Sequence, residues 1–383
     1  MKCEFRPAIL VAAVAVGAAL LFIESDSRDS RWPAQPQRPG LPNCRQASDI
    51  GNHSGQRGLH PGDVARLRKP VGLETPPGAA LEVKAARAVE RGKLETIAGV
   101  QVLTVEGTPA EMGEAAGRLL GPVIRRVVEA MIVKGVAREE EARRNIYRGS
   151  AIMEKYQPEA YREELRAMAQ AAEVSYEDLL LLQYFGDVRR CLAGAGASTF
   201  CTSFAVLPPL TRGDICIVGR NFDYFDQGVG EYASLVVHYR PRGKIPFLTL
   251  TWAGVINGWT LLNAKGLVVS NNTAIGAEAQ SLEGISTCFL LRYIAENAAS
   301  VENGVEIVRQ LPRACGTNLL IASGRPPAAA IVEFDRHSMT VRRPENGFVG
   351  AANDFLLLGR TEPLGYSGRI GKAHEIAPVS YTH

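Results

Sequence analysis

The sequence predicts a layered α+β fold, in which a helical front part precedes a strand-rich back part. Apolar residues recur at helical spacing between residues 109 and 187, and short β-rich runs separated by turn residues follow residue 200. Two further helices, at about 286–299 and 301–311, interrupt these strands and are expected to cover a sheet face. The chain has 383 residues, 46% hydrophobic and 22% charged, a globular composition that excludes wholesale disorder.

The first 79 residues differ from the rest of the chain. Lys2 and Arg6 flank an apolar run from 7 to 23, which is near the shortest length that spans a bilayer and slightly long for a signal-peptide core. Residues 1–23 therefore predict either a cleaved signal peptide or an N-terminal membrane anchor, with a buried core helix as the remaining alternative. The first two predict export, to a membrane-anchored, periplasmic or extracellular location. Residues 24–79 are rich in Pro, Gly, Ser, Arg and Gln, which predicts a disordered linker.

Residues 80–200 are expected to form a helical N-terminal region. The run 97–107, IAGVQVLTVEG, alternates apolar and polar residues and predicts one strand. Thr108 is the expected N-cap of the next helix, with Pro109 at its first position and Glu111 closing a capping box. Three more helices are expected over 137–155, 158–172 and 175–187.

Residues 201–383 are expected to form the strand-rich part. Cys201 begins its first strand, after a connecting segment of small residues at 193–200. The expected strands contain the runs CTSFAVL, DICIVGRNF, SLVVHYR, IPFLTLTW, WTLLNAKGLVVSNN, TNLLIAS, AAAIVEF and MTVRR.

Composition and missing motifs exclude several classes of function. The formal net charge of +3 gives no electrostatic footprint for nucleic acid. The sequence contains no CxxC pair, HExxH, Walker A or G-x-S-x-G motif, so we expect no metal and no cofactor. Seven cysteines cannot all pair within one chain, so at least one thiol is free or pairs with another chain. After export, Cys191 could form a disulfide with either Cys44 or Cys315. A catalytic Cys–His pair is a further alternative, although the sequence does not indicate which histidine would take part.

Polar residues close several of the expected strands. Arg220 to Tyr224 (RNFDY) follows one apolar run, Asn271 and Asn272 follow another, and Asn353 follows a third. Together with Cys201, these residue types fit attack of a thiolate on a carbonyl, with an Asn amide stabilising the oxyanion and Asp and Arg orienting the nucleophile. The alternative is that Asn and Asp end these strands simply as turn formers.

These residues carry a family resemblance. The segments Cys201-Thr-Ser-Phe-Ala, Gly219-Arg-Asn-Phe-Asp-Tyr, Thr251-Trp-Ala-Gly and Asn263-Ala-Lys-Gly-Leu, with Asn272, resemble the acyl-coenzyme A:6-aminopenicillanic acid acyltransferase family, peptidase C45. That family belongs to the N-terminal nucleophile (Ntn) hydrolases and is related to choloylglycine hydrolases and acid-ceramidase-like amidases. The front helices also look like its propeptide, and the likeness runs from about 97 to 370.

The resemblance implies a four-layer αββα sandwich preceded by a helical propeptide-derived region. It implies an inactive precursor that cleaves its own Phe200–Cys201 bond through a thioester, giving an α chain and a β chain. The freed α-amino group of Cys201, with an ordinary pKa of about 8, would then act as the base for its own thiol. No histidine partner is needed in such a site.

The resemblance also implies the site residues. Cys201 matches the nucleophile, Asp223 the carboxylate that binds its amine, and Arg220 the neighbouring guanidinium. Asn272 matches an oxyanion-side Asn, with Asn271 as the alternative register. The remaining two matches are Asn353 and Arg369.

Two departures from the family pattern lie near the C-terminus. Asn353 stands in Ala-Asn-Asp-Phe where many relatives have Thr-Asn-His-Phe. The residues after Arg369 are too few for the closing strands and helix of the fold, which favours a C-terminal truncation or a naturally short end.

The first functional hypothesis is a self-processing amidohydrolase or acyltransferase that cleaves or transfers the acyl group of an N-acyl amide, with acyl-coenzyme A as an alternative donor. The second is a non-catalytic, membrane-tethered binding protein on a degenerate Ntn fold. The third is a conventional cysteine protease with a Cys–His pair. Phe222, Phe225 and Trp259 are expected in the core or in an acyl pocket.

Overall fold

The computed structural model describes most of the chain after residue 85. The described residues are 86–136, 139–193, 201–222, 224, 227–274 and 281–358, with the backbone of 12–15 and 18–21. Phe200, Asp223, Phe225 and Arg369 lie outside them, as does the linker expected at 24–79.

Within the apolar segment 7–23, the described backbone forms two short strands, β1 (Ala12–Ala15) and β2 (Ala18–Leu21), paired antiparallel. Among the described residues, no helix has the length and apolar character needed to cross a membrane. The export and membrane attachment expected from residues 1–23 stay predictions, as do the four expected divisions of the chain.

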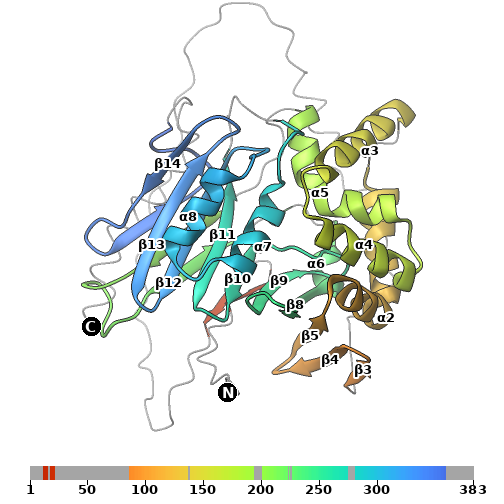
Figure 1. Ribbon diagram of the computed structural model, residues 1–383, viewed down its shortest axis with the longest axis horizontal. Coiled ribbons are helices and arrows are strands. Elements are labelled where there is room, and N and C mark those ends of the chain that lie inside the picture. Colours follow the sequence, from red (N-terminus) through yellow and green to blue (C-terminus); the bar gives the residue numbers. More distant parts are fainter. Residues whose placement is uncertain are drawn as a thin grey trace, which may run out of the picture. The chain divides into compact units, whose positions relative to one another are not determined.

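A ten-stranded sheet joins the front and back parts of the chain, in the order β14-β13-β12-β11-β10-β9-β8-β5-β4-β3 (Figure 1). Its neighbouring strands are antiparallel except β5 and β8, which pair in parallel with Val102 opposite Val236. The N-terminal region therefore contributes strands to the same sheet as the residues after 201. The strands are β3 (Arg87–Val89), β4 (Gly92–Ile97), β5 (Val100–Gly107), β8 (Ser234–Pro241), β9 (Phe247–Trp252), β10 (Thr260–Asn263), β11 (Leu267–Thr273), β12 (Thr317–Gly324), β13 (Pro327–Phe334) and β14 (Met339–Arg342).

A second sheet has the order β15-β6-β7 and is antiparallel. It consists of β15 (Phe348–Ala351), β6 (Thr202–Val206) and β7 (Ile217–Asn221). Leu320 and Ile331 of the large sheet pack against Ala205 and Val349 of the small one. The alternate residues Leu319, Ile321, Ala330 and Val332 belong instead to the main core. Because successive side chains point to opposite faces of a strand, the small sheet covers one face of β12 and β13.

Helices α7 (Thr287–Asn297) and α8 (Val301–Gln310) cover the other face, in agreement with the two helices expected there (Figure 1). Their buried residues, such as Val301 and Val308, share the main core with Ile321. The described residues thus form a helix layer, a large sheet and a small sheet, which confirms the α+β class. The fourth layer of the expected sandwich stays a prediction.

The remaining helices gather beside the β3–β9 part of the large sheet (Figure 1). They are α2 (Pro109–Val128), the π-helix η1 (Glu129–Val133), α3 (Glu140–Glu154), α4 (Glu159–Ala172), α5 (Tyr176–Ala193) and α6 (Val229–Ala233). Helices α2 and α4 pack closely at Gly113, which has no side chain. A Cβ atom at this position would lie only 2.0 Å from the carbonyl oxygen of Glu164. A side chain at this glycine would push the two helices apart.

The strand expected at 97–107 is confirmed over residues 100–107, but its expected start was three residues too early. Ile97 ends β4, Val100 begins β5, and the two strands form a hairpin. Ala98 and Gly99 between them have φ angles of 49° and 83°. Positive φ at both central residues is typical of a two-residue turn that matches the twist of the flanking strands. The alternation of polar and apolar residues continues through such a turn, so periodicity alone did not reveal it.

The expected capping box at the start of α2 is confirmed. The Thr108 Oγ1 atom accepts a hydrogen bond from the Glu111 amide at 3.3 Å, and the Glu111 carboxylate accepts one from the Thr108 amide at 2.7 Å. The pKa of Glu111 is lowered below its ordinary value, chiefly by the hydrogen bond from the Thr108 backbone and next by its contact with the Thr108 side chain. The box satisfies two backbone donors that the helix itself leaves unpaired.

Replacing Thr108 by alanine is expected to lower the free energy of unfolding by about 1 kcal/mol, because the Glu111 amide loses its acceptor. Urea denaturation of the uncut Cys201→Ala chain measures this difference without a change in the number of fragments. Thr108→Ser keeps the hydroxyl and serves as the control. Equal destabilisation by both substitutions would contradict a role of the cap.

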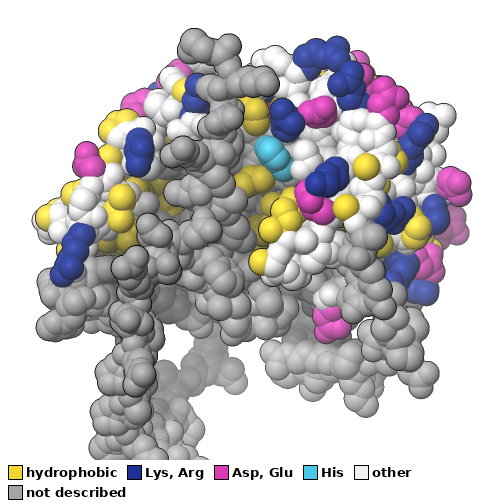
Figure 2. All heavy atoms as spheres, turned by 90° about the horizontal axis from the view of Figure 1, so that it is seen from below, with side chains coloured by type: hydrophobic (Ala, Val, Ile, Leu, Met, Phe, Trp, Pro, Cys, Tyr) yellow, Lys and Arg dark blue, Asp and Glu magenta, His cyan; other side chains and the backbone are white. Residues whose placement is uncertain are grey.

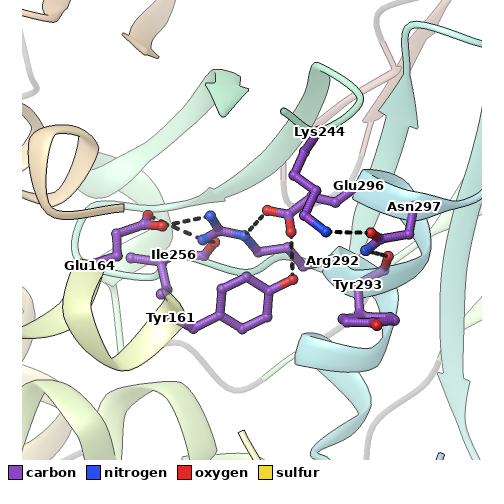
Figure 3. Close-up of polar contacts among 8 residues, drawn as sticks. All are labelled: Tyr161, Glu164, Lys244, Ile256, Arg292, Tyr293, Glu296 and Asn297. Atoms are coloured by element: carbon purple, nitrogen blue, oxygen red, sulfur yellow. Dashed lines mark hydrogen bonds and ion pairs between the residues drawn. The ribbon is translucent and has the colours of Figure 1, made fainter. Parts of the chain in front are cut away.

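A buried ionic cluster links the N-terminal helices to α7 (Figure 3). The Arg292 side chain is 1% exposed, and its Nη1 and Nη2 atoms donate to the two carboxylate oxygens of Glu164 at 3.1 and 2.6 Å. Its Nε atom donates to Glu296 at 2.8 Å, and Nη1 also donates to the carbonyl oxygen of Ile256 at 2.6 Å. The hydroxyl of Tyr161 donates to the other carboxylate oxygen of Glu296 at 2.7 Å.

Aromatic rings surround the same guanidinium group. The Arg292 Cζ atom lies 4.5 Å from the ring centroid of Tyr161 and 4.6 Å from that of Tyr239. Guanidinium groups bind favourably over aromatic faces, and more strongly where water is excluded. The rings therefore offset part of the free-energy cost of burying the Arg292 charge.

The surface carries charges of both signs. On the face shown in Figure 2, Lys and Arg side chains lie among Asp and Glu side chains over the described residues. Exposed ion pairs join some of them, for example Arg240 with Glu106 at 3.0 Å.

Candidate active site

Cys201 lies directly before β6 and is 3% exposed. Its backbone nitrogen donates a hydrogen bond to the Oδ1 atom of Asn353 at 2.7 Å. The Nδ2 atom of Asn353 donates to the carbonyl oxygen of Thr273, at the end of β11, at 2.6 Å. The start of β6, the end of β11 and the turn after β15 therefore meet at Cys201.

Asn318 holds the turn that carries Asn353. Its Nδ2 atom donates to the carbonyl oxygens of Ala352 and Asp354, at 2.9 and 2.8 Å. The buried carboxylate of Glu333 accepts backbone hydrogen bonds from Leu356, Leu357 and Leu358. Neither residue was predicted from the sequence. A polar residue near the start of TNLLIAS and an acid near the end of AAAIVEF were the available signals.

Cys201 lines a cavity with a volume of about 60 Å³. The other lining residues come from η1, α5, α7, β9 and β11, and from the segments that follow β7 and β9. They include Leu182, Gln183, Asp187, Phe222, Tyr224, Trp252, Asn257, Trp259, Asn271, Thr273, Thr287 and Cys288. A space of this size accommodates only a few water molecules.

Aromatic rings form one wall of the cavity. Phe222 stacks on Trp259 with ring centroids 4.8 Å apart, and Trp252 meets Trp259 edge to face at 4.9 Å. Tyr224 stacks on Phe222 at 5.7 Å. The expectation that Phe222 and Trp259 lie in the core or near an acyl pocket is therefore compatible with their position beside Cys201.

The two neighbouring asparagines of β11 differ in their surroundings. Asn271 lines the cavity, and none of the described residues is a hydrogen-bond partner of its Oδ1 atom. Asn272 is fully buried, accepts from Ser203 Oγ at 2.7 Å and donates to the carbonyl oxygen of Ala351 at 3.1 Å. Of the two, Asn271, the alternative register, is thus the one that lines the same cavity as Cys201.

Arg220 lies on β7, next to the strand that Cys201 precedes. It is opposite Ser203 in the β6–β7 register and is 7% exposed. Its Nε atom donates to Thr260 Oγ1 at 2.9 Å, and its Cζ atom lies 5.3 Å from the ring centroid of Phe222. Arg220 therefore supports the aromatic wall. Asp223 and Arg369 lie outside the described residues, so their expected roles stay predictions.

Helix α5 also contributes residues that line the cavity. Gln183 donates to the carbonyl oxygen of Gly254 at 2.8 Å and accepts from the Ile256 amide at 3.0 Å, which fixes the segment after β9. The Asp187 Oδ2 atom accepts from the backbone nitrogen of Thr287, the first residue of α7, at 3.0 Å. Neither residue was singled out from the sequence, because both occur within an ordinary amphipathic helix.

A second thiol lines the same cavity. Burial raises the pKa of the Cys288 thiol far above its ordinary value, so this thiol stays protonated and is a weak nucleophile. None of the described residues that line the cavity is a histidine. In the described part of the chain, no group of three or more His, Cys, Asp or Glu residues is arranged to hold a metal ion.

Comparisons with known proteins agree with the resemblance. Residues 210–372 match the family described as acyl-coenzyme A:6-aminopenicillanic acid acyl-transferase. This range includes Arg220, Asn271 and Asn353 and begins after Cys201. A protein of Archaeoglobus fulgidus, described as uncharacterized, is 23% identical over a match of 270 residues that covers 64% of this chain. The chain spans 45% of that relative's length.

Three solved structures are similar to parts of the chain. The Caenorhabditis elegans ortholog of N-acylethanolamine-hydrolyzing acid amidase is 17% identical, with a TM-score of 0.34, over 43% of this chain and 74% of that chain. Conjugated bile acid hydrolase from Clostridium perfringens is 16% identical, with a TM-score of 0.27, over 39% and 52%. Penicillin V acylase from Agrobacterium tumefaciens is 14% identical, with a TM-score of 0.23, over 40% and 45%. All three TM-scores are below 0.5, so these structures carry no argument about the fold or function of this chain. The family resemblance is supported by the match over residues 210–372.

Proposed function

We propose that the chain is a member of the acyl-coenzyme A:6-aminopenicillanic acid acyl-transferase family, which its residues 210–372 match, and that it is a self-processing amidohydrolase or acyltransferase whose nucleophile is Cys201. The observation that carries the proposal is the position of Cys201. It is a buried cysteine at the start of a strand, beside a cavity, with its backbone nitrogen bound to Asn353 at 2.7 Å. This arrangement holds the nitrogen of the bond to be cleaved in a fixed place.

In self-cleavage, the Cys201 sulfur attacks the carbonyl carbon of Phe200. A C–S bond forms and the C–N bond breaks, with the nitrogen keeping the electron pair and taking up the thiol proton. Water then hydrolyses the thioester, releasing the carboxylate of Phe200 and regenerating the thiol. The product is a β chain that begins with Cys201 and carries a free α-amino group.

In turnover, that amine takes the proton of the Cys201 thiol, and the thiolate attacks the carbonyl carbon of an N-acyl amide. In the uncut chain, the backbone nitrogen of Cys201 donates a hydrogen bond to Asn353. If the freed amine keeps this bond, Asn353 accepts one of its hydrogens, and the lone pair of the amine stays available to take the thiol proton. The Asn271 amide lines the same cavity as Cys201, which supports for it the role expected of an Asn of this pair, stabilisation of the oxyanion. The acyl group then passes from the thioester to water in a hydrolase or to an amine in an acyltransferase.

The aromatic wall favours an apolar acyl group in the substrate. Phe222, Trp252 and Trp259 offer ring faces next to Cys201. Ligand pockets usually enclose about 300 Å³ or more, whereas the cavity of the uncut chain has about 60 Å³. We therefore expect the site to enlarge when a substrate binds.

Replacing Cys201 by alanine is expected to abolish cleavage, because no sulfur remains to attack the Phe200 carbonyl. Wild-type protein should give two fragments on a denaturing gel, and N-terminal sequencing of the C-terminal fragment should read Cys-Thr-Ser-Phe-Ala. The cleavage rate should not depend on protein concentration, since the reaction is intramolecular.

Cys288→Ser is the matched control, because it removes the other thiol of the same cavity and should leave cleavage intact. A folded wild-type chain that stays full-length would reject the proposal and favour a binding protein, and cleavage that persists in Cys201→Ala would reject Cys201 as the nucleophile. Incubating the cleaved protein with N-acyl amino acids, penicillins, N-acylethanolamines or an acyl-coenzyme A then separates hydrolysis from acyl transfer.

A further inference from the structure

Two cysteines lie side by side across the proposed cleavage site. The sulfur atoms of Cys191 and Cys315 are 3.4 Å apart, although 124 positions separate the residues in the sequence. Both are free thiols in the structure. Cys191 lies in the last turn of α5, before the proposed cut, and Cys315 lies just before β12, after it.

The backbone on both sides of this pair is already held together. Arg190 Nη1 donates to the carbonyl oxygen of Gly316 at 3.1 Å, so the residues next to the two cysteines are joined directly. Asp187 forms an ion pair with Arg190 and also accepts from the Thr287 amide. A disulfide bond is about 2.0 Å long, so the sulfurs need to approach by roughly 1.4 Å, which side-chain rotation can supply.

From this geometry we propose that Cys191 and Cys315 form a disulfide, and that this disulfide covalently joins the α and β chains produced by self-cleavage. The joining of two chains rests on the proposed function, whereas formation of the disulfide does not. Sequence left Cys44 and Cys315 as equal partners of Cys191, and the 3.4 Å separation favours Cys315.

The two thiols are suited to different steps of the oxidation. The hydrogen bond from Cys315 lowers the pKa of Cys191, and the same contact raises the pKa of Cys315, with burial as the next cause. Cys191 is half-buried and its neighbour Leu192 is exposed, whereas Cys315 is buried. Cys191 is therefore the thiol that an external oxidant reaches, and it is the better nucleophile.

The oxidant is a small-molecule or protein disulfide. The Cys191 thiolate attacks one of its sulfurs, which forms a mixed disulfide and releases one thiolate. Cys315 then loses its proton and attacks the Cys191 sulfur, which releases the second thiolate. Two protein thiols are thereby oxidised, the oxidant is reduced to two thiols, and the two protons pass to those thiols.

The bond has a consequence for the site. Leu182, Gln183 and Asp187 of α5 line the cavity, yet they would belong to the α chain, while Cys201 would begin the β chain. A disulfide from the last turn of α5 to Cys315 keeps this wall attached after cleavage. Without it, only noncovalent contacts retain the α chain.

The disulfide is tested first in the uncut Cys201→Ala chain, incubated with oxidised glutathione. Trypsin then gives peptides 191–212 and 314–336, in which the substitution leaves Cys191 and Cys315 as the only cysteines. We expect these peptides to be cross-linked in mass spectra and separate after reduction. Free or glutathionylated Cys191 at the end of the reaction, or a cross-link from Cys191 to Cys44, would overturn the proposal.

The joining of the chains is tested in the wild type after self-cleavage. We expect one band on a denaturing gel without reductant and two with it. Cys191→Ser should give two bands under both conditions, and Cys216→Ser should behave as the wild type. Two wild-type bands without reductant would reject the disulfide, whereas a single band with reductant would reject self-cleavage, so the two failures are distinguishable.

Discussion

Replacing Arg292 by methionine is expected to lower the free energy of unfolding by about 3–5 kcal/mol, the usual cost of removing one partner of a buried ion pair. Methionine is unbranched and fills most of the same space, but Glu164 and Glu296 lose the guanidinium that binds them at 2.6 and 2.8 Å. Both carboxylates are then buried without a compensating positive charge. Urea denaturation in the Cys201→Ala background measures the loss on a single uncut chain.

The same variant should show an unusual pH dependence. Burial raises the pKa of Glu164, and Arg292 opposes that rise. Without Arg292, the folded-state pKa lies further above the value of about 4.3 that Glu has in an unfolded chain. An acid with a raised pKa stabilises the folded state below that unfolded value, and the stabilisation is lost as pH rises through the folded value. The deficit relative to the wild type should therefore be larger at pH 8 than at pH 4.5.

Two further variants separate charge from packing. Adding Glu164→Gln and Glu296→Gln to Arg292→Met removes both uncompensated carboxylates and should recover about half of the loss or more. Breaking the exposed Arg309–Glu306 pair of α8 by Arg309→Met should have little effect, because exposed ion pairs contribute little. No recovery in the triple variant would indicate that lost packing, not charge, explains the effect of Arg292→Met.

Local features of the fold could be predicted from the sequence because their determinants are adjacent in the chain. The Thr108–Glu111 capping box lies within four residues, and helical spacing marked α4 and α7 closely. The hairpin turn at Ala98 and Gly99 was missed, since its positive φ angles leave the apolar alternation unchanged.

Contacts between distant segments could not be predicted in this way. The parallel pairing of β5 with β8, and the ion pair of Arg292 with Glu164, join segments more than 100 residues apart. A charged residue inside an apolar helix indicates a buried partner but does not identify it. Cys191 and Cys315 are likewise far apart in the sequence, so the sequence left both Cys44 and Cys315 as partners of Cys191.

The candidate site shows both situations. Cys201 and Asn353 were expected, and the structure brings them within hydrogen-bond distance. Alternation along β11 implies that Asn271 and Asn272 face opposite sides, but only the packing of the two sheets decides which side faces Cys201. Asn318 acts through the backbone of a turn that follows a different strand, so no local pattern marks it.

Replacing Asn353 by alanine is expected to slow self-cleavage by about 100-fold, because a reacting group displaced by about 1 Å commonly loses that much. Asn353 binds the nitrogen of Cys201 at 2.7 Å and is itself held by Thr273 at 2.6 Å, so it fixes the start of β6 to the end of β11. Alanine leaves both backbone groups without this partner. The fraction of cut chain is followed on denaturing gels after refolding from urea.

Two companion variants identify the bond responsible. Asn353→Asp keeps an acceptor for the Cys201 nitrogen but loses the donor to the Thr273 carbonyl, so it should cleave faster than Asn353→Ala if the first bond positions the reacting nitrogen. Asn303→Ala, on the exposed side of α8, should cleave as the wild type does. Equal rates for Asn353→Ala and the wild type, with both folded by circular dichroism, would remove Asn353 from the proposed mechanism and leave Cys201 to be positioned by the strand alone.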